Sequence, residues 1–240
     1  MENGNYISSW SGGKDSCFAC YKALQAGYNV SHLVNFISKE YKRVSFHGIE
    51  AGLIKMQAEL AGIPLYQKET TPDNYENEFK DAVKSLMHNE NNLPLLLKGG
   101  EGELSNGIKG MVFGDIYLEE HRQWVDRVCK ELGVKPIEPL WEKNTEELIK
   151  DFIITGFQAV VVSGQAKFID EGWIGEPVSR DFMEYLKKRS DVDICGENGE
   201  YHTFVVGGPL FKGRIEITEK EVISRNGYWF LDIKDYKVIR

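Results

Sequence analysis

The amino-acid sequence predicts an α/β protein in which a doubly wound, mostly parallel sheet is followed by a second, smaller α/β domain. Three observations support this fold class. A β-prone run, a glycine turn and a helix pattern follow one another within residues 6–27. Short apolar strands then alternate with amphipathic helices up to about residue 135, which is typical of a parallel sheet covered by helices. Beyond residue 136 the pattern changes, and from residue 201 the chain is mostly strands and turns.

Each element expected in the first domain, residues 1–135, has its own sequence signal. Helices are recognised by apolar residues every three or four positions and by a glycine where the helix ends. One such face consists of Ile49, Leu53, Met56 and Leu60, and it ends near Gly62. The expected strands are 6–10, 30–37, 63–66 and 110–114, and the other expected helices are 17–26, one that begins at 71–73, and 119–132.

The second domain, residues 136–240, begins with a capped helix. Asn144 and Glu147 have the spacing of a capping box, which predicts a helix over 145–155. Residues 157–162 form a continuous apolar run, as expected for a buried strand. Ser179 precedes Phe182 and Leu186, which predicts a short helix. We therefore expect a domain boundary near residues 133–140.

Composition and charge exclude several classes of protein. The 240 residues are 42% hydrophobic and 28% charged, which is typical of a globular rather than a fibrous or disordered chain. No apolar run approaches the roughly 20 residues of a membrane span. The N-terminus lacks the features of a secretory signal, and four cysteines are too few for a disulfide scaffold, so we expect a cytoplasmic protein. A net charge of −8 argues against direct, charge-driven binding to nucleic acid, although it leaves a local basic patch open.

The turn between the first strand and the first helix carries the strongest functional signal. Its residues are Ser11, Gly12, Gly13, Lys14, Asp15 and Ser16. A glycine turn that opens a helix directs backbone N–H groups and the positive end of the helix dipole toward an anion. The glycines permit close approach of a phosphate, the serines offer hydroxyl groups, and Lys14 adds a mobile positive charge. The turn is not a Walker A motif, because Ser8 replaces its first glycine and Asp15 follows the lysine.

A second polar cluster occupies residues 193–203, with the sequence Asp-Ile-Cys-Gly-Glu-Asn-Gly-Glu-Tyr-His-Thr. Its glycines allow sharp turns, so Glu197, Glu200 and His202 can converge on one point. Histidine exchanges protons near neutral pH, and carboxylates orient an amine or ammonium. A polar hairpin loop is the alternative interpretation from composition alone.

Residues 11–16 resemble the PP-loop of the ATP-pyrophosphatases in the adenine nucleotide alpha-hydrolase-like group. Residues 196–203 resemble the glutamate-rich signature of the diphthine–ammonia ligases, and residues 114–116, 139–141 and 170–175 fit the same family. The resemblance runs from about residue 6 to about residue 213. It implies an ATP-dependent ligase that adenylates the diphthine carboxylate of elongation factor 2 and amidates it with ammonia, releasing AMP and pyrophosphate.

The resemblance also implies roles for individual residues, with residues 1–135 binding ATP and residues 136–240 the substrate. The expected ATP-binding residues are Ser11, Gly12, Gly13, Lys14, Asp15, Ser16, Asn35, Phe36, Gly114 and Asp115. The expected Mg²⁺ ligands are Asp15 and Asp115, and the expected catalytic residues are Lys14, Glu197, Glu200 and His202. The expected partners are elongation factor 2 and ammonium, with no membrane, and a homo-oligomer is left open.

Other interpretations of the same motifs lead to different tests. Another PP-loop ATP-pyrophosphatase would modify a tRNA or amidate a small molecule. A sulfonucleotide reductase would need Cys195, and a nucleotide sensor would bind ATP without releasing pyrophosphate.

Cys17 and Cys20 open a helix and have no second cysteine pair, so we interpret them as packed thiols rather than as a redox or zinc motif. Residues 98–103 are acidic and precede no helix, so we interpret them as a surface loop rather than a second phosphate loop.

Overall fold

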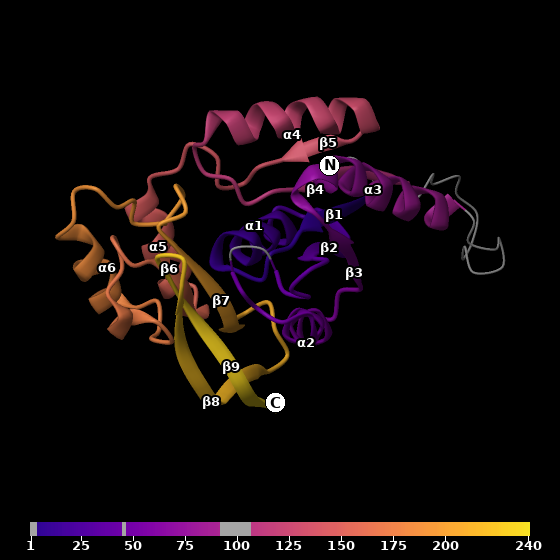
Figure 1. The fold of residues 1–240 in the computed structure, drawn as a ribbon. Helices are drawn as coiled ribbons and strands as arrows, with labels where there is room; N and C mark the ends of the chain where they lie inside the picture. Colours follow the sequence, from indigo (N-terminus) through magenta and orange to yellow (C-terminus); the bar gives the residue numbers. More distant parts are fainter. Residues whose placement is uncertain (1–3, 45–46, 92–106) are drawn as a thin grey trace.

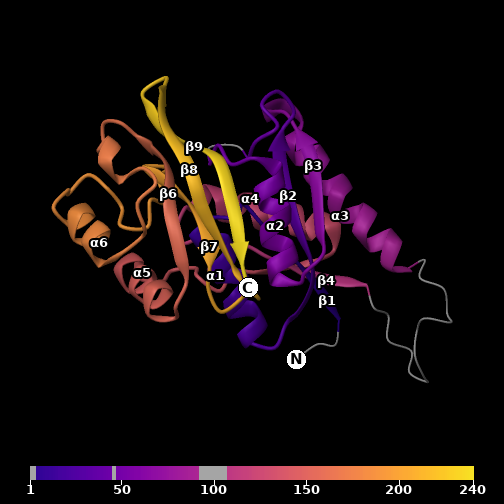
Figure 2. The same cartoon turned by 90° about the horizontal axis from the view of Figure 1, so that it is seen from below.

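The computed structural model describes residues 4–44, 47–91 and 107–240, which form two sheets that lie side by side (Figures 1 and 2). The first sheet has five parallel strands in the order β3-β2-β1-β4-β5. They are β1 (Asn5–Ser9), β2 (Asn29–Ser38), β3 (Leu65–Thr70), β4 (Ile108–Val112) and β5 (Lys135–Ile137). The loop predicted at 98–103 lies outside the described residues.

Helices cover both faces of the first sheet, which confirms the doubly wound prediction. The helices are α1 (Lys14–Gln25), α2 (Ala51–Ala61), α3 (Tyr75–Asn91) and α4 (Glu119–Leu132). One hydrophobic cluster contains Phe18 of α1 and Ile54 of α2, and a separate cluster contains Phe79 of α3 and Val128 of α4. The pairs α1/α2 and α3/α4 therefore lie on opposite faces (Figure 1). None of the helices in the described ranges is long and apolar enough to cross a bilayer.

Glycine sets the helix ends where the sequence predicted them. α4 spans the predicted residues 119–132, and Gly62 and Gly133 have φ of +69° and +67° in the left-handed conformation of a helix C-cap. The strand predicted at 63–66 begins two residues later, at Leu65. The reason is that Ile63 N still donates to the Ala58 carbonyl and so belongs to the end of α2.

The second sheet is antiparallel, in the order β7-β6-β9-β8. Its strands are β6 (Gln158–Gln165), β7 (Tyr201–Gly207), β8 (Arg214–Arg225) and β9 (Tyr228–Ile239), with helices α5 (Thr145–Ile154) and α6 (Arg180–Lys187). Both predicted caps are confirmed. The Asn144 side chain accepts from Glu147 N at 3.0 Å, and the Ser179 side chain accepts from Phe182 N at 3.3 Å.

The two sheets share one hydrophobic cluster. The ring of Phe18 in α1 meets the rings of Phe152 and Phe157 edge-on, with centroids 5.8 Å away in both cases. Strand β7 also bonds to the first sheet's glycine turn, because Val205 N donates to the Gly12 carbonyl at 2.9 Å. The junction between the sheets therefore lies against residues 11–16.

Candidate active site

The PP-loop, residues 11–16, lies where the strand order of the first sheet reverses. The order runs from β1 to β2 and β3 on one side and to β4 and β5 on the other, so the ends of β1 and β4 flank the topological switch point. Gly12 has φ +81°, and a Cβ there would lie 2.6 Å from Gln57 Oε1. A Cβ at Gly13 would lie 2.7 Å from His47 Cε1. Gly12 therefore requires glycine, and a side chain at Gly13 would have to displace the His47 ring.

The PP-loop fits a chain of phosphates. The N-cap of α1 is Gly13, which has no side chain to bond the N–H groups of the first helical turn. The positive end of this helix points at the loop. The Ser11 hydroxyl accepts from Gly13 N at 3.3 Å and lies 3.2 Å from the Ser16 hydroxyl. The first turn of α1 and two hydroxyl groups are thus gathered around one loop.

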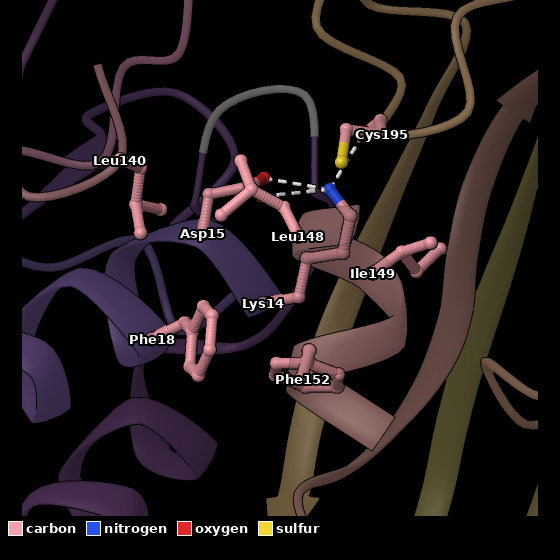
Figure 3. A pocket seen from close by; sticks show the side chains of 8 residues that line it. All are labelled: Lys14, Asp15, Phe18, Leu140, Leu148, Ile149, Phe152 and Cys195. Carbon is pink, nitrogen blue, oxygen red and sulfur yellow. Dashed lines mark hydrogen bonds and ion pairs between the residues drawn. The ribbon is translucent and has the colours of Figure 1, made fainter. Parts of the chain in front are cut away.

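Lys14 is buried, with 4% of its surface exposed, and its ammonium bonds three protein oxygens (Figure 3). They are Asp15 Oδ1 at 2.9 Å, Asp15 Oδ2 at 2.7 Å and the Cys195 carbonyl at 2.5 Å. Burial lowers the pKa of Lys14, but the Asp15 carboxylate outweighs burial, so the pKa is raised and the lysine stays charged. The prediction that Lys14 carries a mobile charge is therefore wrong, because a buried ammonium requires an acceptor for each of its protons.

Gln57 connects the PP-loop to both sheets. Its Nε2 donates to the carbonyls of Gly12 (3.0 Å) and Val205 (2.6 Å), and its Oε1 accepts from Trp10 Nε1 (3.1 Å). Thr203 of β7 adds a further connection, since its hydroxyl accepts from Lys14 N at 3.0 Å. Gln57 was not among the predicted site residues, although its position among the apolar residues of α2 was a usable signal.

The turn at residues 193–200, here called the glutamate turn, reaches the loop that follows β4. Glu197 Oε1 accepts from Ile116 N at 2.8 Å and from Tyr117 N at 3.4 Å. Burial raises the pKa of Glu197 to about 7; the Ile116 N–H opposes this shift, and the carboxylates of Asp15 and Asp115 add to it. Glu197 therefore exchanges a proton near neutral pH.

Glu200 is buried, and hydrogen bonds reach only one of its two carboxylate oxygens. Its Oε1 accepts from Asp193 N at 2.8 Å and from Asn198 Nδ2 at 3.1 Å, whereas Oε2 is buried with no hydrogen-bond partner among the described groups. Asn198 also donates to the Tyr117 hydroxyl at 3.1 Å. A buried carboxylate oxygen without a partner is costly, so it fits an N–H donor that comes with a ligand.

His202 lies on β7 and packs against His47, which was not among the predicted site residues. The rings of His202 and His47 are 4.7 Å apart, and His47 Nδ1 lies 3.0 Å from the Thr203 carbonyl. Because a carbonyl only accepts, Nδ1 carries the proton. Burial lowers the pKa of His47 to about 4 against the opposing Thr203 carbonyl, and burial also lowers the pKa of His202. Both rings are neutral at pH 7. Convergence of His202 with Glu197 and Glu200 stays a prediction.

Asn35 and Phe36 lie at different faces of the first sheet. Asn35 is buried, donates to the Trp10 carbonyl at 2.7 Å and accepts from Gln67 Nε2 at 2.9 Å. Phe36 is half-buried, and its ring lies 5.2 Å from that of Tyr75. Asn35 therefore supports the strand before the PP-loop, while Phe36 belongs to an aromatic surface at the other face.

The predicted metal ligands both have protein partners. Asp15 is held by Lys14, and Asp115 Oδ1 lies 3.0 Å from His121 Nδ1. A Cβ at Gly114 would lie 2.8 Å from the carbonyl carbon of Asp15, so the end of β4 touches the PP-loop. Within the described ranges, no three His, Cys, Asp or Glu side chains are grouped to hold a metal ion.

The cysteines are packed thiols, as expected. Cys17 and Cys20 are fully buried, and burial raises the pKa of the Cys20 thiol to about 12. The Cys195 thiol donates to the Thr145 carbonyl at 3.2 Å, and burial raises its pKa as well. A thiol with a raised pKa is a poor nucleophile, which argues against the reductase alternative.

Comparisons with known proteins cover nearly the whole chain. Residues 4–136 match the model of the diphthamide synthase N-terminal domain, and residues 144–239 match that of the diphthamide synthase C-terminal domain. A Homo sapiens protein named diphthine--ammonia ligase is 30% identical over 93% of this chain and 86% of its own length. The Bos taurus protein of that name is 29% identical with the same coverage. The Schizosaccharomyces pombe one is 30% identical over 90% of this chain, which spans 36% of that longer relative.

One solved structure, described as a predicted subunit of tRNA methyltransferase from Methanocaldococcus jannaschii, superposes with a TM-score of 0.42 at 15% identity, covering 86% of this chain and 98% of that chain. The two domain models together account for nearly all of the present sequence. The chain therefore belongs to the diphthamide synthase family and is an ATP-dependent ligase that forms a C–N bond.

Proposed function

We propose that the chain adenylates the diphthine carboxylate of elongation factor 2 and amidates it with ammonia, releasing AMP and pyrophosphate. The observation that supports this most directly is the contact between the PP-loop and the glutamate turn, in which Lys14 Nζ bonds the Cys195 carbonyl. A loop suited to phosphates beside an acidic turn fits a reaction that activates a carboxylate and then brings an amine to it. The relatives named diphthine--ammonia ligase support the same pair of substrates.

In this proposal residues 1–135 bind ATP and residues 136–240 bind the protein substrate. The N–H groups at the start of α1 and the hydroxyls of Ser11 and Ser16 hold the pyrophosphate end, and Phe36 borders the adenine. When bound, ATP supplies the carboxylate with AMP as a leaving group. A single well-placed donor stabilises charge in such a transition state by roughly 3–4 kcal/mol. The cytoplasmic location and the lack of direct nucleic-acid binding stay predictions, and a homo-oligomer stays open.

Mg²⁺ would accompany the phosphates, because it binds ATP through their oxygens. Asp115 fits as its protein ligand, since the neighbouring Gly114 touches the PP-loop backbone. Asp15 fits less well, because it would first have to release the Lys14 ammonium that bonds both of its oxygens. We therefore assign the ion to the phosphates and Asp115.

Two residues of the glutamate turn suit the amidation step. The unpartnered Oε2 of Glu200 accepts an N–H from ammonia or from the imidazolium of the substrate. Glu197, whose pKa lies at about 7, takes up a proton as the C–N bond forms. His202 and His47 are neutral, and His47 lies beside Gly13, so this pair of rings adds no charge near the phosphates.

The test is release of AMP and pyrophosphate from ATP and Mg²⁺, with and without ammonium and diphthine-bearing elongation factor 2. We expect release to require the factor and to fall at least about 100-fold in Glu200→Gln. The amide oxygen takes the place of Oε1 and accepts from Asp193 N, which leaves an N–H₂ donor where an N–H must be accepted. The matched control is Glu59→Gln, an exposed glutamate on α2. Turnover without the factor, or equal activity of Glu200→Gln and wild type, would contradict the proposal.

A further inference from the structure

A small pocket lies between α1 and α5, beside the PP-loop (Figure 3). Its volume is about 10 Å³, close to the minimum that holds one molecule the size of water. Five apolar side chains form its walls: Phe18, Leu140, Leu148, Ile149 and Phe152. Lys14, Asp15 and Cys195 form its polar end. We call it the α1–α5 pocket.

The polar end of the α1–α5 pocket has hydrogen-bond acceptors, but its side-chain donors are already bonded to protein oxygens. The three protons of Lys14 go to the Asp15 carboxylate and the Cys195 carbonyl. The Cys195 thiol, the other side-chain donor among the described lining residues, donates to the Thr145 carbonyl. Lone pairs on Asp15 and on the Cys195 carbonyl remain. A guest that donates protons is therefore favoured over one that needs donors.

Ammonia matches this lining better than water does. Buried water makes two to four hydrogen bonds and uses its lone pairs as well as its protons. Ammonia has three N–H donors and a single lone pair. The charges of Lys14 and Asp15 offset each other, and the apolar walls penalise a further ion, so neutral ammonia is favoured over ammonium. Its lone pair finds no side-chain donor among the lining residues and stays nucleophilic.

We propose that the α1–α5 pocket binds ammonia and supplies it to the adenylated substrate, an inference that rests on the amidation proposed above. The pocket adjoins both parts of the site, because Lys14 and Asp15 belong to the PP-loop and Cys195 lies two residues before Glu197. The nitrogen lone pair forms the C–N bond to the adenylated carboxyl carbon. The C–O bond to AMP breaks, AMP leaves with that electron pair, and one nitrogen proton passes to the Glu197 carboxylate.

The size of the pocket predicts which amines react. Methylamine carries one additional methyl group, and Leu148→Ala makes room for it, with Leu148→Val as a milder variant that retains more of the core. Leu132→Ala is the matched control, because Leu132 is 8% exposed like Leu148 but belongs to the cluster on the other face of the first sheet. The assay measures kcat/KM for ammonium and for methylammonium by mass spectrometry of diphthine-bearing elongation factor 2, with AMP release in parallel.

We expect Leu148→Ala to raise the methylammonium-to-ammonium ratio of kcat/KM by about ten-fold or more, since one methyl group in a pocket is worth about that much. Leu148→Val should raise the ratio less, and Leu132→Ala should leave it unchanged. If both Leu148 variants amidate with ammonium at an unchanged ratio, the pocket assignment is overturned while the proposed function stands. If wild type releases no AMP and forms no amide with either amine, the proposed function fails and the pocket assignment fails with it.

Discussion

Gln57 joins the PP-loop to both sheets, so its replacement by methionine tests how the loop is held. Gln57→Met retains the length of the side chain but removes the amide. Its Nε2 no longer donates to the carbonyls of Gly12 and Val205, and its Oε1 no longer accepts from Trp10 Nε1. The Gly12 carbonyl keeps the hydrogen bond from Val205 N at 2.9 Å. The Trp10 N–H and the Val205 carbonyl lose the Gln57 amide as their partner. Both groups lie in a buried site, because Trp10 is 1% exposed and Gln57 is 0% exposed.

Each buried polar group left without its partner costs about 1–3 kcal/mol. Two such groups, partly offset by the apolar methionine, lower the free energy of unfolding by about 3 kcal/mol. Trp10→Phe removes one of the orphaned groups in advance. In a double-mutant cycle, Gln57→Met should therefore cost about 1 kcal/mol less in the Trp10→Phe background than in the wild type.

The assay is urea unfolding followed by tryptophan fluorescence, with the affinity for ATP measured in parallel. Gln123→Met on the exposed face of α4 is the control and should change the free energy of unfolding by less than about 0.5 kcal/mol. We expect Gln57→Met also to weaken ATP binding, because the Gly12 carbonyl and the PP-loop lose their fixed position. A cost for Gln57→Met no larger than that of Gln123→Met would refute the reasoning.

Three further variants test the site. Burial raises the pKa of Glu197 from 4.5 to about 7, so between these pH values the folded protein keeps a proton that the unfolded chain loses. The free energy of unfolding therefore falls by about 3 kcal/mol as the pH rises from 4.5 to about 7. Urea titrations of Glu197→Gln across pH 4–8 should lack this decline. The pKa of His47 is lowered from 6.5 to about 4, so its contribution to stability is lost as pH falls through that range. His47→Asn, which keeps a donor near the Nδ1 position, should remove this acid sensitivity with little change at pH 7, whereas an unaltered acid profile would count against the assignment. Gly114→Ala places a Cβ 2.8 Å from the Asp15 carbonyl carbon and should weaken ATP binding, measured by calorimetry, at least about ten-fold. The control is Gly172→Ala, which has open space around the new Cβ and should bind ATP as wild type does.

The sequence predicts elements best where two local signals coincide. For α4, the apolar face of Val125, Val128 and Leu132 and the glycine that follows agree on one helix, and both of its ends are confirmed. For β3, the apolar run from Ile63 overlaps the cap of α2, and one backbone hydrogen bond from Ile63 decides the boundary. That bond depends on how the helix ends and cannot be seen in hydrophobicity alone.

The candidate site is predictable only as far as it is local. The PP-loop and the glutamate turn are short contiguous motifs, so their residue types indicate their chemistry. Gln57, His47 and Thr203 contact the loop from three other segments, and the sequence has no signal that brings them together. The orientation of Lys14 also depends on a distant segment, because the Cys195 carbonyl that accepts one of its protons belongs to the glutamate turn.

The contacts of Lys14 also show that the candidate site does not belong to the first sheet alone. Moving the second sheet away would remove the Cys195 carbonyl from a buried ammonium and would expose the edge-on contacts of Phe18 with Phe152 and Phe157. Losing an acceptor costs a charged group more than a neutral one, and each large ring forfeits about 2–3 kcal/mol when its burial is lost. The two sheets should therefore unfold together, and changes at their junction should alter ATP binding even when they leave the PP-loop residues intact.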